Sequence, residues 1–305
     1  MPKIETSELS AQFINQNFVR KLEEGRTKEA ADEGSRFIRS KMRQDSFARE
    51  ILEPVELGPD EIDRDENTDQ PKKIIEKEPD STATFATFKG TGQRTFFKGP
   101  RYSVPFGKVE SQHFTKSKFE LLTYQNDIRK ILTDNSVKDM AEQEDQKFMD
   151  LVNAAIGVSS NSANGGADFN GAGHIKQGIQ MLLNKQIPCG KILMSKHLYY
   201  EILDWTQTTF GDTVAGRHYD DGIEGEKTLF GFPVITTIRR DMLKVNNDDA
   251  MYFFAPENYL GNFFLLQDAT LFIKQEADMI EFWSYSAPGI GIGNTNAVAR
   301  VIVKD

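Results

Sequence analysis

The sequence is short of the residues from which catalytic and metal sites are built. Its 305 residues contain one cysteine, Cys189, which excludes an intramolecular disulfide and any multi-cysteine zinc site. The four histidines have neither H-x-x-x-H nor H-x-H spacing, so we expect no metal centre: His113, His174, His197 and His218. Neither the nucleophile motif G-x-S-x-G nor the phosphate-binding motif G-x-x-x-x-G-K-[ST] occurs. We therefore expect a protein that is not an enzyme and holds no cofactor.

Long apolar runs are also missing. No stretch approaches the ~20 apolar residues of a membrane span, and the N-terminus has no apolar signal region. Hydrophobic residues make up only 38% of the chain, yet phenylalanine occurs 22 times. A chain that is polar on average and rich in phenylalanine often completes its burial against neighbouring molecules. We expect a protein of a reducing compartment, with no membrane contact, that works in an assembly.

Two apparent ligand motifs fail on inspection. Residues 289–293 read Gly-Ile-Gly-Ile-Gly, but Asn294 stands where a dinucleotide-binding loop needs its third glycine, so we expect a flexible turn. Residues 63–67 open like a calcium loop, but Thr68 and Ile74 occupy positions that require glycine and glutamate. Residues 53–80, which include this second segment, are predicted to be a solvated acidic linker.

Charge is strongly segregated along the chain. The net charge is −9. Residues 53–80 hold four basic and eleven acidic side chains, whereas residues 81–118 hold seven basic and one acidic. A basic block on an acidic protein needs a partner surface, which is either nucleic acid or the acidic body of another copy.

A long helix is predicted from Ser136 to Ile156. Ser136 is expected to cap it and Asp139 to complement its N-terminus. Apolar residues recur at helical spacing with one gap, at Glu144. Glu142 and Asp145 are assigned to its polar face, so the helix is expected to lie on a surface.

The segments before this helix are predicted to be extensions. Residues 1–52 form two amphipathic helices without a core of their own; Phe13 and Phe18 belong to an apolar stripe that is expected to be ordered only on a neighbouring subunit. Residues 84–88 and 94–98 are predicted to form a basic, aromatic β-hairpin, and residues 101–106 an edge strand.

The segments after the helix are predicted to form a mixed α+β body without regular βαβ repeats. Residues 158–173 are expected to be a loop, 174–184 a helix and 191–194 a buried strand, with Ser195 capping the next helix. Further strands are predicted at 228–235, 250–256, 263–267, 270–275, 280–286 and 297–303.

This order of features resembles the major capsid proteins of tailed bacteriophages, which have the Hong Kong 97-type fold. The resemblance depends on four stretches, which cover residues 78–81, 97–106, 134–139 and 229–234. It implies an N-terminal arm at 1–52 and an acidic lead with an extended hairpin, the E-loop, at 53–118. It also implies a peripheral domain with the spine helix at 119–165 and 263–305, and an axial domain at 166–262.

The resemblance implies hexamers and pentamers that close an icosahedral head around packaged double-stranded DNA, in a virion made in the host cytoplasm. Scaffolding, portal and possibly cement proteins would be further partners. Because residues 1–52 already correspond to the arm, we expect a separate scaffolding protein to guide assembly. The candidate contacts between subunits are Phe13, Phe18, Arg94, Phe96, Phe97, Lys98, Arg101, Tyr102, Glu142 and Asp145.

Two alternatives stay open. An encapsulin-like shell that encloses protein cargo shares this fold. A nucleic-acid-binding protein could use the basic hairpin, with bases stacked on its aromatic rings.

Overall fold

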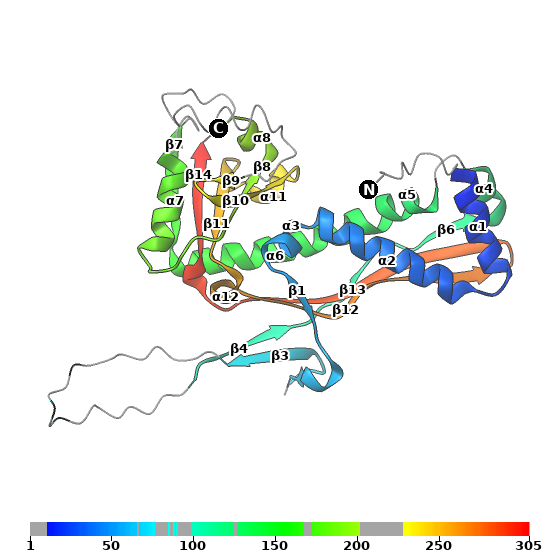
Figure 1. Cartoon of the computed structure of the whole chain (residues 1–305), viewed down its shortest axis with the longest axis horizontal. Helices are drawn as coiled ribbons and strands as arrows, with labels where there is room; N and C mark the ends of the chain where they lie inside the picture. The colour runs from blue at the N-terminus through cyan, green and yellow to red at the C-terminus, as the bar shows by residue number, and fades with distance from the viewer. Residues whose placement is uncertain are drawn as a thin grey trace.

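The computed structural model describes residues 11–65, 67–76, 99–124, 127–167, 173–201 and 228–304, together with Phe85, Phe88 and Gly90. These residues form an elongated α+β molecule, which confirms the predicted class (Figure 1). A long helix runs from a compact six-stranded body at one end towards a layer of helices on a long sheet at the other. A small three-stranded sheet projects from the middle.

The long helix begins earlier than the sequence predicted. Three helical segments follow one another without a break: α5 (Ile128–Leu132), the π-helical turn η2 (Thr133–Val137) and α6 (Lys138–Ser159). The cap is Asp127, whose carboxylate accepts a hydrogen bond from the backbone N–H of Lys130 at 2.8 Å. The prediction that Ser136 caps the helix is wrong, because Ser136 lies inside the helix and is fully buried.

The six-stranded sheet forms the compact body. Its strands, in spatial order, are β7 (Ser162–Ala167), β14 (Val298–Lys304), β11 (Asp249–Phe254), β8 (Lys191–Ser195), β10 (Phe232–Thr237) and β9 (Thr228–Leu229). Short helices accompany it: α7 (Gly173–Leu183), α8 (Lys196–Glu201), α11 (Arg240–Leu243) and α12 (Glu257–Leu260). The hydroxyl of Ser195 accepts a hydrogen bond from the N–H of Leu198, as predicted.

The structure differs from two expectations about this body. The segment expected to be a loop after the long helix contains β7, which pairs in parallel with β14. The expected boundaries assign the C-terminal strand to the peripheral part, whereas the hydrogen bonds of β14 lie in the six-stranded sheet. The sequence does not predict β7, because this strand is short and polar and lacks alternating apolar residues. Its hydrogen bonds come from pairing with β14.

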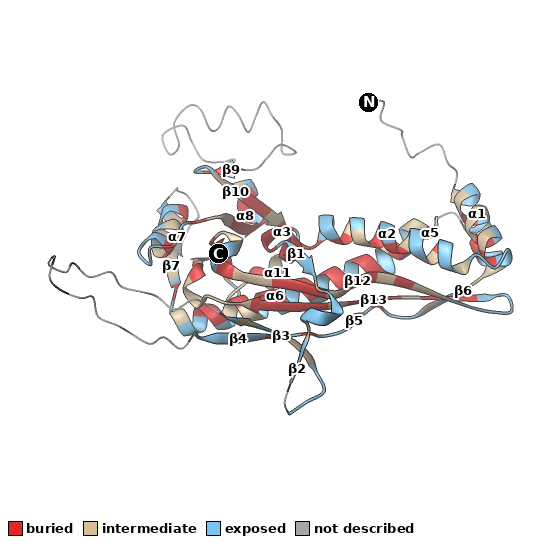
Figure 2. Cartoon of the chain, turned by 60° about the horizontal axis from the view of Figure 1, so that its bottom comes forward, coloured by how far each residue is buried: buried red, intermediate tan, exposed pale blue. Residues whose placement is uncertain are grey.

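The long sheet is built on a hairpin of two long strands. They are β12 (Gly261–Glu276) and β13 (Met279–Ile292), flanked by β1 (Pro54–Glu56), β5 (Val109–Glu110) and β6 (Phe114–Ser117). The helices α1 (Ala11–Glu23), α2 (Thr27–Asp45), α3 (Phe47–Ile51) and α4 (Lys118–Thr123) accompany this sheet. In Figure 2 the buried side of α2 faces β12.

The N-terminal helices α1 and α2 pack on strands of their own chain. Val19 and Leu22 of α1 are buried with Phe282 of β13 in one apolar cluster of the same chain. On α2, the hydroxyl of Ser35 accepts a hydrogen bond from the N–H of Leu271 on β12, 236 residues away in sequence. The expectation that residues 11–52 need a second subunit for burial is therefore wrong, because their partner is a distant strand of the same chain.

The projecting sheet consists of β2 (Asp63–Arg64), β3 (Pro71–Glu76) and β4 (Arg101–Pro105). The predicted strand at 101–106 is confirmed. The predicted acidic linker is wrong in part, because β1 and β3 lie within it and the short helix η1 (Pro59–Glu61) separates them. These strands form because β1 pairs with β12 and β3 pairs with β4, and the acidic composition of the segment gives no sign of either pairing.

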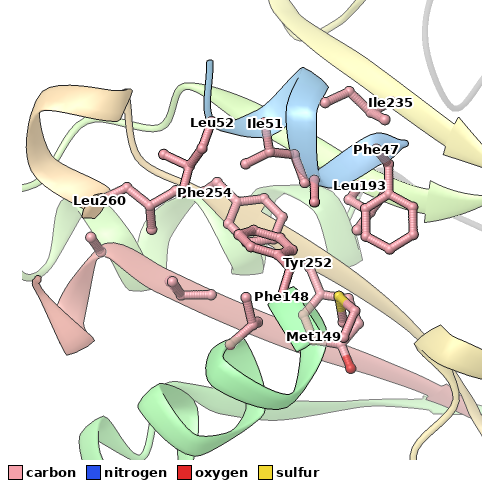
Figure 3. Close-up of a cluster of buried hydrophobic side chains, with 14 of the residues drawn as sticks. Phe47, Ile51, Leu52, Phe148, Met149, Leu193, Ile235, Tyr252, Phe254 and Leu260 are labelled. Atoms are coloured by element: carbon pink, nitrogen blue, oxygen red, sulfur yellow. The ribbon is translucent and has the colours of Figure 1, made fainter. Parts of the chain in front are cut away.

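The largest apolar core joins the body to the long helix. Figure 3 shows Phe148 and Met149 of α6 packed with Tyr252 and Phe254 of β11 and with Phe47 of α3. Cys189 is buried in a second cluster beneath the six-stranded sheet, as expected of a small core residue. A third cluster lies between the N-terminal helices and the far half of the β12–β13 hairpin.

Candidate assembly surfaces

The two strands β3 and β4 are called the ribbon root here, and β4 is seated on a stripe of glycines in β13. A Cβ atom placed on Gly291 of β13 would lie 2.4 Å from a methyl group of Val104, and one on Gly289 would lie 2.6 Å from the ring of Phe106. The side chains of Val104 and Phe106 can approach the backbone of β13 this closely only because glycine has no side chain. The glycines therefore allow β4 to lie directly on β13.

This arrangement corrects the prediction for residues 289–293. They are not a flexible turn: Gly289 and Gly291 are buried within β13. The alternation of isoleucine and glycine gives one strand a side-chain face and a flat face. The flat face receives Val104, which is fully buried.

Tyr102 and Arg101 of the ribbon root differ in exposure. The Tyr102 hydroxyl accepts a hydrogen bond from the side-chain amide of Asn262 at 2.7 Å, and partial burial raises the pKa of the phenol. Arg101 is about two-thirds exposed and pairs with Glu76 across the ribbon at 2.5 Å. Arg101 is therefore accessible to a neighbour, whereas Tyr102 serves mainly to fix the root to β12.

The remaining predicted hairpin contacts, Arg94, Phe96, Phe97 and Lys98, lie outside the described residues. Two phenylalanines of the same segment, Phe85 and Phe88, are described and fully exposed. Exposed aromatic rings are expected of a segment that is covered by another molecule.

The predicted contacts on the long helix separate into one exposed and one buried residue. Glu142 is exposed. Asp145 is fully buried, so its assignment as a contact between subunits is wrong. It accepts hydrogen bonds from the Ser46 hydroxyl at 2.8 Å and the Ala48 N–H at 3.0 Å, and it forms an ion pair with Arg239.

Beside Asp145, a second carboxylate is also buried. Glu144 is fully buried and accepts hydrogen bonds from both Nε and Nη2 of Arg49, at 2.7 and 2.9 Å. The same guanidinium donates to Asp268 of β12 at 3.0 Å. Burial alone would lower the pKa of Arg49, but the contacts with Glu144 and Asp268 raise it above its usual value.

The surroundings of Arg49 favour its charged form, whereas those of Asp145 disfavour its charged form. Burial raises the pKa of this carboxyl to about 6. Hydrogen bonds from Ala48 and Ser46 and the charge of Arg239 oppose the rise in pKa, while the neighbouring Glu144 adds to it.

Sequence reasoning missed Arg49, Asp268 and Arg239, but it contained one signal. Glu144 was the single gap in the apolar stripe of the predicted helix. A carboxylate at a core position requires a cation, because an unpaired buried charge is too costly. Which arginine supplies it depends on an element that lies 95 residues away in sequence.

The two N-terminal contacts also differ. Phe13 is half exposed. Phe18 packs against Phe282 with ring centroids 5.8 Å apart, so most of its surface serves the fold of its own chain. Only Phe13 remains a candidate for contact with another molecule.

Other kinds of site find no support in the described part of the chain. Within it, no group of histidine, cysteine and carboxylate side chains could hold a metal ion. Among the described helices, none has the length and apolarity to span a bilayer.

A long helix beside a long sheet built on one hairpin, a projecting ribbon and a compact body define the architecture of capsid proteins of the Hong Kong 97 type. Comparison with solved structures confirms this fold. The chain matches the asymmetric unit of the mature capsid of bacteriophage PhiM1 with a TM-score of 0.56 and 11% identity, covering 85% of this chain and 87% of that chain.

Two further structures match at similar levels. A structure from Microbacterium phage Oxtober96 gives a TM-score of 0.59 at 10% identity, covering 85% of this chain and 91% of that one. A virus-like particle from Pyrococcus furiosus gives 0.54 at 14% identity, covering 90% and 99%. No protein-family model and no curated protein matches the sequence. At these identities the likeness establishes the fold.

Proposed function

We propose that the chain is a major capsid protein whose copies form the hexamers and pentamers of an icosahedral phage head around double-stranded DNA. The observation that carries the proposal is the fold match to a mature capsid over most of both chains. The protein would act as a structural component of the virion, without turnover of its own. Synthesis in the host cytoplasm and cooperation with scaffolding, portal and cement proteins belong to the same proposal.

The ribbon root and the predicted hairpin beyond it, together called the ribbon, are the proposed contact between subunits within a ring. The ribbon root lies on the glycine stripe of β13, and Phe85 and Phe88 beyond the root are fully exposed. A projection at one place on a molecule and its receiving surface at another give a head-to-tail contact, which forms a ring when the rotation between successive subunits closes. Arg94, Phe96, Phe97, Lys98 and Arg101 are proposed to contribute on the ribbon side, and Phe13 and Glu142 on the receiving side.

The receiving surface is less acidic than the sequence suggested. The stretch from Ser136 to Ile156 contains five acidic residues, and two of them, Glu144 and Asp145, are buried and paired with arginines. The contribution of charge to the contact is therefore modest, and exposed aromatic rings are the larger expected contribution.

Electron microscopy of the purified protein tests the proposal. Closed icosahedral particles that protect double-stranded DNA from nuclease are expected when the chain is expressed with its phage partners. The chain expressed alone is expected to give few or irregular shells. A protein that stays monomeric under every condition, partners included, would refute the shell role.

An encapsulin-like shell is the second candidate. It is favoured by the match to the Pyrococcus virus-like particle, which covers 99% of that chain. Uniform shells formed by the chain alone, containing a co-purified protein instead of DNA, would favour this candidate over the phage head.

A nucleic-acid-binding module is less well supported. Two basic residues of the proposed binding block, Arg101 and Lys108, already pair with Glu76 and Glu110. Binding of the unassembled subunit to single-stranded DNA with a steep salt dependence would revive this alternative.

Charge reversal tests the ribbon contact. The variant R94E/K98E is expected to reduce assembly while the circular dichroism of the subunit stays unchanged. The matched control is the reversal K28E/R36E, which makes the same change of net charge at two exposed positions of α2, outside the ribbon. Normal shells from R94E/K98E would show that these charges do not contribute to the contact.

A further inference from the structure

A buried polar layer crosses the molecule between two apolar cores, and the long helix shows it most clearly. At the N-terminal end of α6, Met140 belongs to the core beneath the N-terminal helices. Phe148, Met149, Val152 and Ile156 belong to the core shared with the six-stranded sheet. Between them lie Glu144 and Asp145, both fully buried.

The same succession occurs on β12. Leu265 packs in the core of the six-stranded body and Leu271 in the core of the N-terminal helices. Asp268 lies between them and is 5% exposed. On β13, the buried Ser286 donates a hydrogen bond to Glu144 at 3.1 Å, so this strand also contributes a polar group.

The layer contains equal numbers of positive and negative charges. Three carboxylates face three guanidinium groups: Glu144, Asp145 and Asp268 with Arg39, Arg49 and Arg239. Arg49 and Glu144 form a bidentate pair, whereas Arg39 approaches Asp268 only to 3.8 Å. The layer is electrically neutral, and its charged groups come from separate segments of the chain.

Two of the segments that cross the layer are interrupted there. The helical path from α2 to α3 breaks at Ser46, which has extended backbone angles of −92° and 115°. The pairing of β12 with β13 shifts register between Leu265 and Gln267 and again between Gln267 and Thr270. In contrast, the helix α6 passes through the layer without a break.

A stability argument does not account for this construction. Replacing a buried ion pair by apolar side chains of similar size is often neutral or stabilising, so such pairs add little net stability. Interlocked apolar side chains resist sliding because every displacement opens voids. In the polar layer, charged groups joined by hydrogen bonds replace such packing. The two apolar cores therefore do not interlock there.

We propose that the polar layer is a joint at which the two apolar cores tilt relative to each other, so that one sequence fits shell positions of different curvature. The proposal rests on the proposed shell function. Hexamers and pentamers require subunits in non-equivalent surroundings. The ion pairs keep the layer satisfied in more than one arrangement, and α6 and β13 keep the two halves connected.

An apolar replacement of the central triad tests the joint. The variant R49M/E144L/D268L removes the charges at similar side-chain volume. The unassembled subunit is expected to unfold at a denaturant concentration equal to or above that of the wild type. Its assembly products are expected to lose most closed shells in favour of open sheets, tubes or shells of one altered curvature.

The matched control is an ion pair outside the layer whose carboxylate is also buried. Arg240 donates from Nε to both carboxylate oxygens of Asp249, at 2.8 and 3.0 Å, within the six-stranded body. The variant R240M/D249L is expected to form closed shells of normal size. Closed shells of normal size and yield from the triad variant would overturn the joint.

A direct measurement on wild-type shells covers the case in which the triad variant does not fold. Subunits from pentamers and hexamers are resolved by electron cryomicroscopy and superposed on the core around Phe148. We expect the core around Leu271 to be rotated between the two positions, about an axis in the polar layer. Identical subunits would overturn the joint and leave the shell function intact, whereas failure of the wild type to form shells would refute the shell function itself.

Discussion

The ribbon root and the polar layer are both places where distant segments cross at close range, but they are built in opposite ways. At the root, glycines remove side chains so that β4 rests on bare backbone of β13. In the layer, charged side chains fill the space between the crossing elements. The root is therefore specified by shape and the layer by charge.

This difference determines how each place responds to change. Contacts of shape depend on volume and are insensitive to pH and salt. Contacts of buried charge depend on protonation and on the presence of every partner. The two places can be separated experimentally by asking which kind of perturbation changes the stability of each one.

The largest effect is expected where one member of the charged set is removed. Arg49→Ala leaves Glu144 and Asp268 buried without their main cation, and breaking a buried pair in this way costs about 3–5 kcal/mol. Urea unfolding of the unassembled subunit measures the loss. Arg36→Ala is the control, because Arg36 is exposed and forms no ion pair among the described residues; a loss at Arg49 no larger than at Arg36 would contradict the charge-based account.

A change of pH is expected to produce the next largest effect, through Asp145. Its pKa is raised to about 6, so between about pH 4 and 6 the folded chain keeps a proton that the unfolded chain has released. This contribution to stability is complete below about pH 4 and is lost as the pH rises through about 6, by an amount on the order of 2–3 kcal/mol.

The variant Asp145→Asn isolates that effect. The asparagine side chain cannot titrate and retains an oxygen for the Ala48 N–H, so the unfolding free energy of the variant is expected to vary less between about pH 4 and 6. The groups that face residue 145 in both proteins are Glu144, Arg239, Ser46 and the backbone of Ala48. Parallel pH profiles of the two proteins would show that Asp145 does not carry the dependence.

The same comparison shows how far sequence reasoning reaches. The long helix, the body strands other than β7 and the edge strand at 101–106 were predicted because apolar periodicity and turn residues are local. The helix start was missed because Ser136 has a capping side chain, yet the helix continues through it to Asp127. A local signal identified a possible cap without excluding an earlier one.

The candidate contacts were less predictable because exposure is a tertiary property. Asp145 and Glu142 look alike in sequence, but only Asp145 meets the N-terminus of α3 and Arg239. The stripe of Gly289 and Gly291 resembled a turn until β4 was seen to lie on it. In each case the deciding partner comes from a segment that local patterns do not connect.

At the ribbon root, the expected effect of a change in volume is smaller. Gly291→Ala places a methyl group 2.4 Å from Val104, and overpacking of this kind costs about 1–3 kcal/mol. The double variant V104A/G291A makes room for the methyl group. Its loss of unfolding free energy is expected to be smaller than the sum of the two single losses; simple additivity would show that the two residues do not contact each other.

The smallest effect is expected at the hydrogen bond that fixes the ribbon root to β12. Tyr102→Phe removes the hydroxyl that accepts from Asn262 at 2.7 Å, and a single neutral hydrogen bond contributes about 0.5–1.5 kcal/mol. Because Asn262 is partly exposed, water can replace the lost partner, which places the expected loss at the lower end. The change should not depend on pH between about 5 and 8, in contrast to the change at Asp145, since neither partner titrates there. Hydrogen exchange of the amides in β3 and β4 provides the local readout: faster exchange there, with unchanged exchange in β11, is expected if this bond secures the root. Equal exchange in the two proteins would mean that the glycine stripe alone holds the ribbon root in place.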